Sequence, residues 1–160
     1  MQTVHLFDIA TKTWFAQPTT AKQGFYPSGR FRFCSVVASA ADNSSHNIYI
    51  FGGWDQSDLL LSGVFILTLP AFQWVQVYSE SPDNSESPDN VRLTTSHKCE
   101  KIYEKHMVSY RGVSGSCDGE IKSQGMMIFD MSSLTWTTKV GLENQKYLVP
   151  QVLYDIIGGK

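Results

Sequence analysis

HLFDIATKTW (His5–Trp14), FILTLPAFQW (Phe65–Trp74) and MIFDMSSLTW (Met127–Trp136) are three versions of one ten-residue pattern. Each has strand-forming apolar residues, then Asp or Thr, one further apolar residue, a short turn and a Trp. The Trp residues lie 60 and 62 positions apart. A near-constant period with an anchoring Trp indicates that one supersecondary unit is repeated, and such units bury their apolar faces against each other.

The segments around the second and third decapeptides have strand character and are bounded by turn residues. Four short strands in succession predict a four-stranded antiparallel sheet in each unit. The expected strands are Phe33–Ser39, Asn47–Phe51, Val64–Leu69 and Phe72–Tyr78 in one unit, and His97–Tyr103, Lys105–Tyr110, Gly125–Met131 and Leu134–Lys139 in the next.

These units define the expected organisation of a single domain over residues 1–160. The chain enters through the end of a unit in 1–20, with a strand at Val4–Ile9. Full units occupy 30–78 and 91–140, the second of them degenerate. Between them, residues 79–90 repeat the hexapeptide SESPDN in tandem and predict a solvated loop. Residues 147–160, with the apolar stretch Val152–Ile157, predict the start of a further unit or a closing strand.

A strand ending in two glycines, a strand ending near Asp, and a Trp about twenty residues after the glycines resemble the kelch repeat. The residues that carry the pattern are Gly52, Gly53 and Trp74, then Gly112, Asp130 and Trp136, then Asp8 and Trp14. The resemblance is strongest to kelch proteins of filamentous fungi, which include galactose-oxidase-like and cell-surface proteins. It implies an all-β fold, a partial kelch β-propeller with two full four-stranded blades and parts of two more.

Each element of this motif has a physical reason. Glycines permit a sharp turn beside a neighbouring chain, and Asp can accept backbone hydrogen bonds in the turn that follows it. A Trp on the outer strand is large enough to fill the gap between adjacent sheets. Thr68 replaces the Asp in the middle unit and Arg111 replaces the first glycine in the last, so we expect the last blade to be the less regular one.

Composition narrows the class of protein further. The chain is 42% hydrophobic and 18% charged, with a net charge of −2, which argues against disorder and gives no electrostatic reason to expect nucleic acid. The start of the sequence does not resemble a signal peptide. The uncharged stretch Leu59–Ser79 is interrupted by polar residues and Pro70, so no membrane segment is expected in this chain. The compartment stays unknown, although the resemblance suggests a secreted or cell-surface parent.

The number of units poses a problem. Propellers close with roughly four to eight blades, and this chain supplies two full units. We expect a fragment of a larger protein, from a truncated gene model or a gene remnant. The alternatives are several copies assembled into a ring through exposed blade edges, and an open, capped arc.

No catalytic, cofactor-binding or metal-binding residues are expected. A galactose-oxidase-like copper site needs two His ligands, Tyr ligands and a Cys linked to Tyr, and the four histidines (His5, His46, His97 and His106) do not converge with such a pair. Cys34, Cys99 and Cys117 allow one internal disulfide, but small buried thiols are favoured and the pairing is left open.

The predicted function is a non-catalytic interaction scaffold that binds a protein or a carbohydrate. The expected binding loop holds Trp54 and Asp55, with Arg30 and Arg32 before the first strand; packing of Trp54 between blades is the alternative. Asn43 lies in an N-glycosylation sequon. The alternatives are the remnant of a propeller oxidase that lacks its metal site, and a truncated chain with no independent function.

Overall fold

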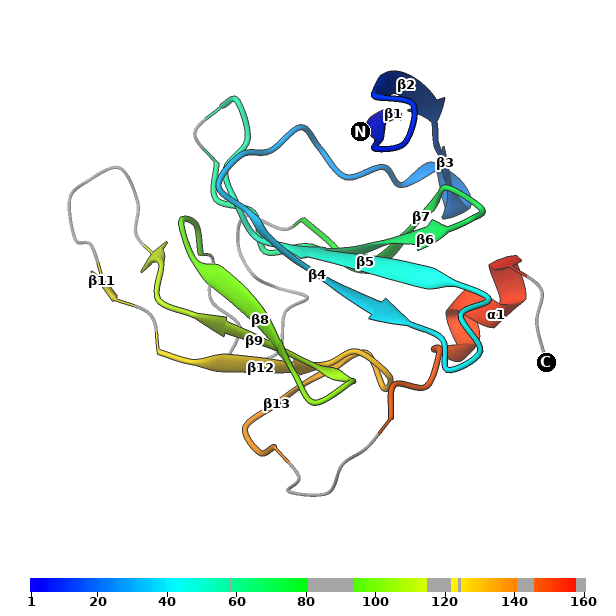
Figure 1. The fold of residues 1–160 in the computed structure, drawn as a ribbon. Coiled ribbons are helices and arrows are strands. Elements are labelled where there is room, and N and C mark those ends of the chain that lie inside the picture. Colours follow the sequence, from blue (N-terminus) through cyan, green and yellow to red (C-terminus); the bar gives the residue numbers. More distant parts are fainter. Residues whose placement is uncertain (58, 81–93, 115–121, 124, 141–145, 158–160) are drawn as a thin grey trace.

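The computed structural model describes residues 1–57, 59–80, 94–114, 122–123, 125–140 and 146–157. Most of the tandem SESPDN insert, and Cys117, lie outside these residues. The described strands form mainly antiparallel sheets, and the prediction of an all-β partial propeller is confirmed. Figure 1 shows the two larger sheets packed against each other, with the first hairpin standing apart and a short helix near the C-terminus.

The middle unit forms one five-stranded sheet in the order β3-β7-β6-β5-β4. Its antiparallel strands are β4 (Cys34–Ser39), β5 (His46–Phe51), β6 (Val64–Leu69) and β7 (Gln73–Tyr78). All four coincide with the predicted strands to within a residue. The fifth, β3 (Thr20–Ala21), was not predicted; it runs parallel to the outer strand β7 and follows a direct link from the first unit.

The third unit forms a four-stranded sheet in the order β13-β12-β9-β8. Its strands are β8 (Lys98–Ile102), β9 (His106–Tyr110), β12 (Met127–Asp130) and β13 (Thr135–Thr137). A short hairpin of β10 (Val113–Ser114) and β11 (Lys122–Ser123) branches off between β9 and β12 and was not predicted.

The first unit is a lone hairpin of β1 (Thr3–Asp8) and β2 (Thr13–Pro18). The decapeptide alignment makes these the two outer strands of a blade. Within the described residues, no strand pairs with the other edge of β1. Trp14 is accordingly 67% exposed, and its one ring contact among the described aromatic residues is with Phe7, with the centroids 5.0 Å apart.

Alternate side chains of the middle sheet enter two different cores. Val64 and Ile66 of β6 face the third unit, where they pack with Met107 and Phe129. The intervening residues of β6 face the other way and pack with Trp74 and Ile50. Because successive side chains on a strand point to opposite faces, this strand is buried on both sides.

The C-terminal stretch does not form the predicted strand. Residues Gln151–Ile157 form the helix α1, so the expectation of a closing strand in this segment is wrong, while the start of a further unit stays a prediction. Pro150 begins the helix, and its carbonyl accepts the amide of Leu153 at 2.9 Å. A proline is well suited to the start of a helix and lacks the amide that a central strand needs. Leu153 is fully buried in the core between the two large sheets.

A buried hydrogen-bond network fastens this C-terminal segment to both blades. The hydroxyls of Tyr49 and Tyr147 lie 2.8 Å apart, and Asn47 donates to Tyr147 at 3.1 Å. Tyr49 also donates to the carbonyl of Met131 in the third unit at 2.8 Å. Burial raises the pKa of Tyr147 to about 12, so both hydroxyls stay protonated and able to donate.

The turns after β5 and β9 hold left-handed backbone, as the double-glycine motif requires. Gly52 and Gly53 have φ of 66° and 100°, and Arg111 and Gly112 have φ of 59° and 105°. Arg111 therefore takes the conformation of the glycine that it replaces. Gly52 also approaches its neighbour closely, since a Cβ on this residue would lie 2.6 Å from the Thr94 carbonyl oxygen.

We expect Gly52→Ala to lower the free energy of unfolding by at least ~2 kcal/mol, because it adds a strained φ to a clash with backbone. Gly29→Ala is the matched control, since nothing lies within 4 Å of the added Cβ. Urea unfolding of both variants would measure the difference. Equal midpoints for the two variants would contradict this account of the turn.

Candidate functional site

One end of the blades, called here the loop end, gathers the predicted binding residues. It comprises residues 28–33, 52–57, 59–61 and 94–97. Trp54 exchanges two backbone hydrogen bonds of 2.9 Å with Phe31 and forms a second bridge with Leu60. The amide of Gly53 donates to the Thr94 carbonyl at 3.0 Å, and that of Ser96 donates to the Arg32 carbonyl at 3.0 Å. The loops from both blades are thus tied together by backbone contacts.

Arg30 lies inside this frame. Its guanidinium pairs with the carboxylate of Glu80, donates to the Gly52 carbonyl at 3.1 Å and lies 5.3 Å from the centre of the Phe65 ring. Burial lowers the pKa of Arg30 to about 10, which leaves it charged at neutral pH. Glu80 belongs to the first copy of SESPDN, so this residue of the predicted solvated loop takes part in a buried ion pair.

Asp55 holds the shape of its own loop. Its Oδ1 accepts the amides of Ser57 at 2.8 Å and Leu59 at 2.9 Å. Asp8 and Asp130 do the same in the turns after their strands, each accepting two backbone amides. Lys105 also pairs with Asp130 at 2.9 Å. Burial alone would raise the pKa of Asp130, but Lys105 and the amides of Ser133 and Ser132 together lower it below its usual value.

Among the described residues, the outward surface of the loop end carries large apolar side chains and the cation of Arg32, beside the exposed polar residues Gln56, Ser57 and Ser96. Phe31, Phe33 and Leu59 are 43%, 37% and 49% exposed. The exposed Arg32 holds its guanidinium 5.8 Å from the centre of the Phe31 ring. Trp54 is half-buried, with its ring 6.2 Å from Phe31 in an edge-on arrangement. We call Phe31, Arg32, Phe33, Trp54 and Leu59 the loop patch.

Asn43 lies at the opposite end of the same blade, in the exposed hairpin between β4 and β5. Its amide donates to the Ala40 carbonyl at 2.9 Å. A cavity of about 350 Å³ opens beside this hairpin, between Pro70 and the C-terminal residues Tyr147 and Tyr154. The Tyr147 hydroxyl is already engaged with Tyr49 and Asn47, so it offers this cavity little free polar chemistry.

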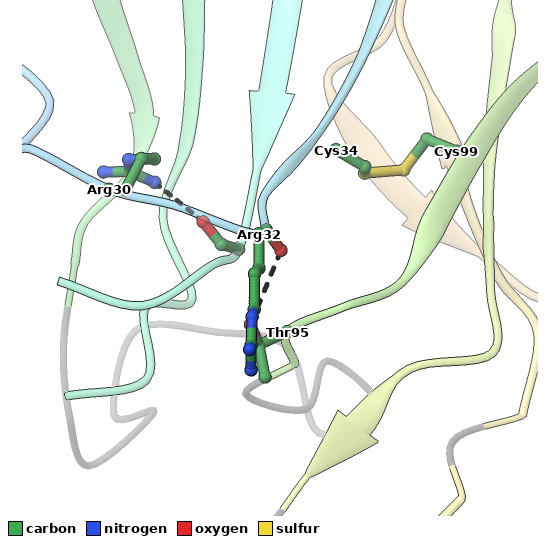
Figure 2. The surroundings of a disulfide bond; sticks show 6 residues. Arg30, Arg32, Cys34, Thr95 and Cys99 are labelled. Atoms are coloured by element: carbon green, nitrogen blue, oxygen red, sulfur yellow. Dashed lines mark hydrogen bonds between the residues drawn. A yellow bond between two sulfur atoms is a disulfide. The ribbon is translucent and has the colours of Figure 1, made fainter. Parts of the chain in front are cut away.

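A disulfide joins the inner strands of the two full blades, contrary to the expectation of separate buried thiols. Cys34 opens β4 and Cys99 lies in β8, with their Cα atoms 5.5 Å apart. Figure 2 shows the bond bridging the two strands, next to the hydrogen bonds of Arg30 and of the Arg32 carbonyl. The sequence left this pairing open, because 65 positions separate the two cysteines.

His97 lies beside this disulfide. One of its ring nitrogens and the two sulfur atoms all lie within 4.8 Å of one another. Its side chain is 5% exposed, and neither ring nitrogen makes a hydrogen bond of regular geometry to another described residue. Burial lowers the pKa of His97 to about 4, although the nearby Phe51 carbonyl offsets part of that effect. No metal ligand was predicted from the sequence, because the cluster forms only where β4 and β8, which belong to different sheets, pack against each other.

The other three histidines are dispersed. His5 and His46 are exposed on separate sheets, and His46 hydrogen-bonds Ser39 at 2.8 Å. His106 is buried with its Nε2 3.6 Å from Asp130.

Within the part of the chain that the structure describes, no helix is long and apolar enough to cross a membrane.

Repeated four-stranded sheets with a shared turn and an anchoring Trp define a β-repeat protein built as a partial propeller. A scan against protein-family models finds no match. A curated kelch repeat-containing protein from Arthroderma benhamiae is 32% identical to this chain over 187 aligned positions, which include 99% of the chain. The similarity supports the assignment of kelch-type repeats. The chain spans about a quarter of the length of that relative.

Reduction of the Cys34–Cys99 bond should lower the free energy of unfolding by ~4 kcal/mol, because the bond closes a loop of 65 residues in the unfolded chain. Urea unfolding of Cys117→Ser protein with and without a dithiol would measure it. Cys99→Ser/Cys117→Ser protein, which cannot form the bond, should not respond to the dithiol. An unchanged midpoint in the first protein would contradict the cross-link.

The free energy of unfolding should also fall at acidic pH, because His97 is protonated more readily in the unfolded chain than in the folded chain. The unfolded chain takes up a proton on this residue near its usual pKa of 6.5, whereas the folded, oxidised chain does so only near pH 4. Stability attributable to His97 is therefore complete above pH 6.5 and declines by about 3 kcal/mol as the pH falls to 4. His97→Phe, which copies the equivalent Phe33, should unfold with a flatter pH profile by urea titration. Parallel profiles for the two proteins would refute this role.

Proposed function

We propose that this chain is a non-catalytic kelch-repeat interaction scaffold that binds a protein partner through the loop patch. The observation that carries the proposal is the exposure of Phe31, Phe33 and Leu59 together on loops that backbone hydrogen bonds hold in place. Aromatic residues and Arg are enriched at the energetic centres of protein interfaces, and a rigid surface loses little conformational entropy on binding.

A protein partner suits the loop patch better than a carbohydrate. Sugar recognition needs polar groups free to hydrogen-bond hydroxyls beside an exposed ring. Of the predicted polar residues here, Arg30 is engaged with Glu80 and Gly52, and Oδ1 of Asp55 is engaged by its own loop. The largest exposed side chains are apolar, with the cation of Arg32 beside them, and the exposed polar residues of these loops are the small or uncharged Gln56, Ser57 and Ser96. We therefore infer a partner segment with apolar side chains flanked by an acidic one.

The disulfide and the sequon support an extracellular or secretory setting. Disulfides form and persist mainly in oxidising compartments, and the exposed position of Asn43 suits glycan attachment. The secreted or cell-surface origin that the fungal resemblance implies is proposed on these grounds. The oxidase alternative gains no support from the described histidines, because His5, His46 and His106 lie apart from the disulfide cluster. Stoichiometric copper with a tyrosyl-radical absorbance in purified protein would reverse this assignment.

The binding proposal is tested with matched surface variants. Proteins captured by the immobilised chain from an extract or culture medium of its source organism would be identified, purified and titrated back by calorimetry. Leu59→Asp and Phe31→Asp should each weaken binding at least tenfold, because a buried, unpaired carboxylate costs more than ~1.4 kcal/mol.

Phe25→Asp is the control, since Phe25 is 51% exposed outside the loop patch. In urea titrations, all three variants should keep the free energy of unfolding of the unmodified chain to within ~0.5 kcal/mol. A purified partner that binds the loop-patch variants as tightly as the Phe25→Asp control would place the interface elsewhere.

A further inference from the structure

The strongest unassigned chemistry in the molecule is the cluster of Cys34, His97 and Cys99. Cys34 lies in the inner strand β4 of one blade, and Cys99 lies in the inner strand β8 of the next. His97 directly precedes β8 and supplies the imidazole. Cys34 and His97 are 6% and 5% exposed, and Cys99 is half-buried. Thiolates and neutral imidazole are the ligands that zinc prefers.

His97 occupies the place that Phe33 holds in the preceding unit. Phe33 packs on Gly53 and His97 packs on Gly112, in each case with the Cβ under 3 Å from where a glycine Cβ would be. An apolar ring fills the position in one blade, so the fold itself does not require an imidazole there. A buried histidine without regular hydrogen bonds is costly unless its lone pair has another use.

The imidazole is also held in a fixed place. A Cβ on Gly52 would lie 2.7 Å from Cε1 of His97, and the Phe51 ring packs edge-on against it with centroids 5.2 Å apart. The glycine turn after β5 and the Phe51 ring therefore lie against the imidazole, and the turn after β9 lies against its Cβ. A preformed ligand position of this kind lowers the cost of assembling a metal site.

We propose that, when the Cys34–Cys99 bond is reduced, Cys34, Cys99 and His97 bind one zinc ion between the two blades. The reduction takes two electrons and two protons from a dithiol, which becomes a disulfide, and it yields two thiols. Zinc then displaces one proton from each thiol. An external disulfide reverses the sequence: exchange with the thiolates rejoins the two sulfurs and releases the ion, while the external disulfide takes up two electrons and two protons and becomes a dithiol.

Geometry and charge both favour zinc at this position. The His97 nitrogen already lies within 4.8 Å of both sulfurs. Two sulfurs bound to one zinc ion lie about 3.8 Å apart in a tetrahedral site, so the sulfurs, bonded to each other in the oxidised chain, must separate after reduction. Two thiolates and a divalent ion sum to zero, so the buried complex carries no net charge, whereas a monovalent copper ion would leave one negative charge buried. Three protein ligands leave a fourth position of the tetrahedron for a water molecule.

The site couples the blades in either redox state. The newly made, reduced chain would be cross-linked through zinc, and the oxidised chain is cross-linked through sulfur. The inner strands β4 and β8 are thereby held together before and after oxidation.

The test uses the full chain with Cys117→Ser, so that only the two clustered cysteines remain. After reduction and anaerobic removal of the reductant, zinc is titrated against a chromophoric chelator, and cobalt is titrated as a spectroscopic substitute. We expect one zinc per reduced chain, a thiolate-to-cobalt charge-transfer band, and no stoichiometric zinc on the oxidised chain. His97→Phe should weaken zinc binding at least tenfold, while His5→Ala, at an exposed position, should leave it unchanged.

A second readout covers variants that fold poorly. Zinc should slow alkylation of both thiols at least tenfold in the reduced chain, and less in His97→Phe, without any need for a cysteine variant. Three results would each overturn the proposal. They are failure of the reduced chain to bind one zinc ion, equal zinc affinity in His97→Phe and in the chain that keeps His97, and equal zinc binding by the oxidised and reduced chains.

Discussion

The structure depends on one strand being buried on both faces. Val64 and Ile66 of β6 enter the core shared with the third unit, and Phe65 and Leu67 enter the core shared with the first. A single sheet cannot bury both of its faces by itself, so each unit is stable only between two neighbours. The lone β1–β2 hairpin shows the converse, because its apolar side chains Phe7, Trp14 and Phe15 are about half exposed or more.

The repeated decapeptide encodes a turn as well as a strand pair. Lys12, Phe72 and Leu134, each two residues before a Trp, all have positive φ between 51° and 58°. The same turn therefore precedes each of the three Trp residues. How far each Trp is buried depends on whether a neighbouring unit packs against it. Trp74 is 3% exposed and donates to the Met1 carbonyl at 3.0 Å, whereas Trp136 packs its ring 4.8 Å from Phe51 of the preceding blade.

The sequence was sufficient for the strands because local patterns determine them. Alternating apolar residues and glycine turns marked β4 to β9 and β12 to within a few residues, and the Asp-containing turns followed the same periodicity. It failed at the C-terminus, where the apolar content of 152–157 outweighed Pro150, the signal for a helix start. It failed again at the cysteines, because Cys34 and Cys99 meet only when two blades pack with a particular offset between β4 and β8. The role of Glu80 was hidden for the same reason, since its partner Arg30 is fifty residues away.

The loop patch and the cysteine–histidine cluster share one frame. The carbonyl of Arg32 accepts the Ser96 amide at 3.0 Å and lies 3.5 Å from the Thr95 hydroxyl. The side chain of Arg32 faces outward, while Cys34, two residues further along, joins the third unit. Gly52 links the two regions from the other side, since it contacts both Thr94 and His97. The separation of β4 and β8 at the cluster therefore fixes the spacing of Phe31 and Arg32 from residues 94–97. The binding surface that we propose therefore depends on how closely β4 and β8 are held beneath it.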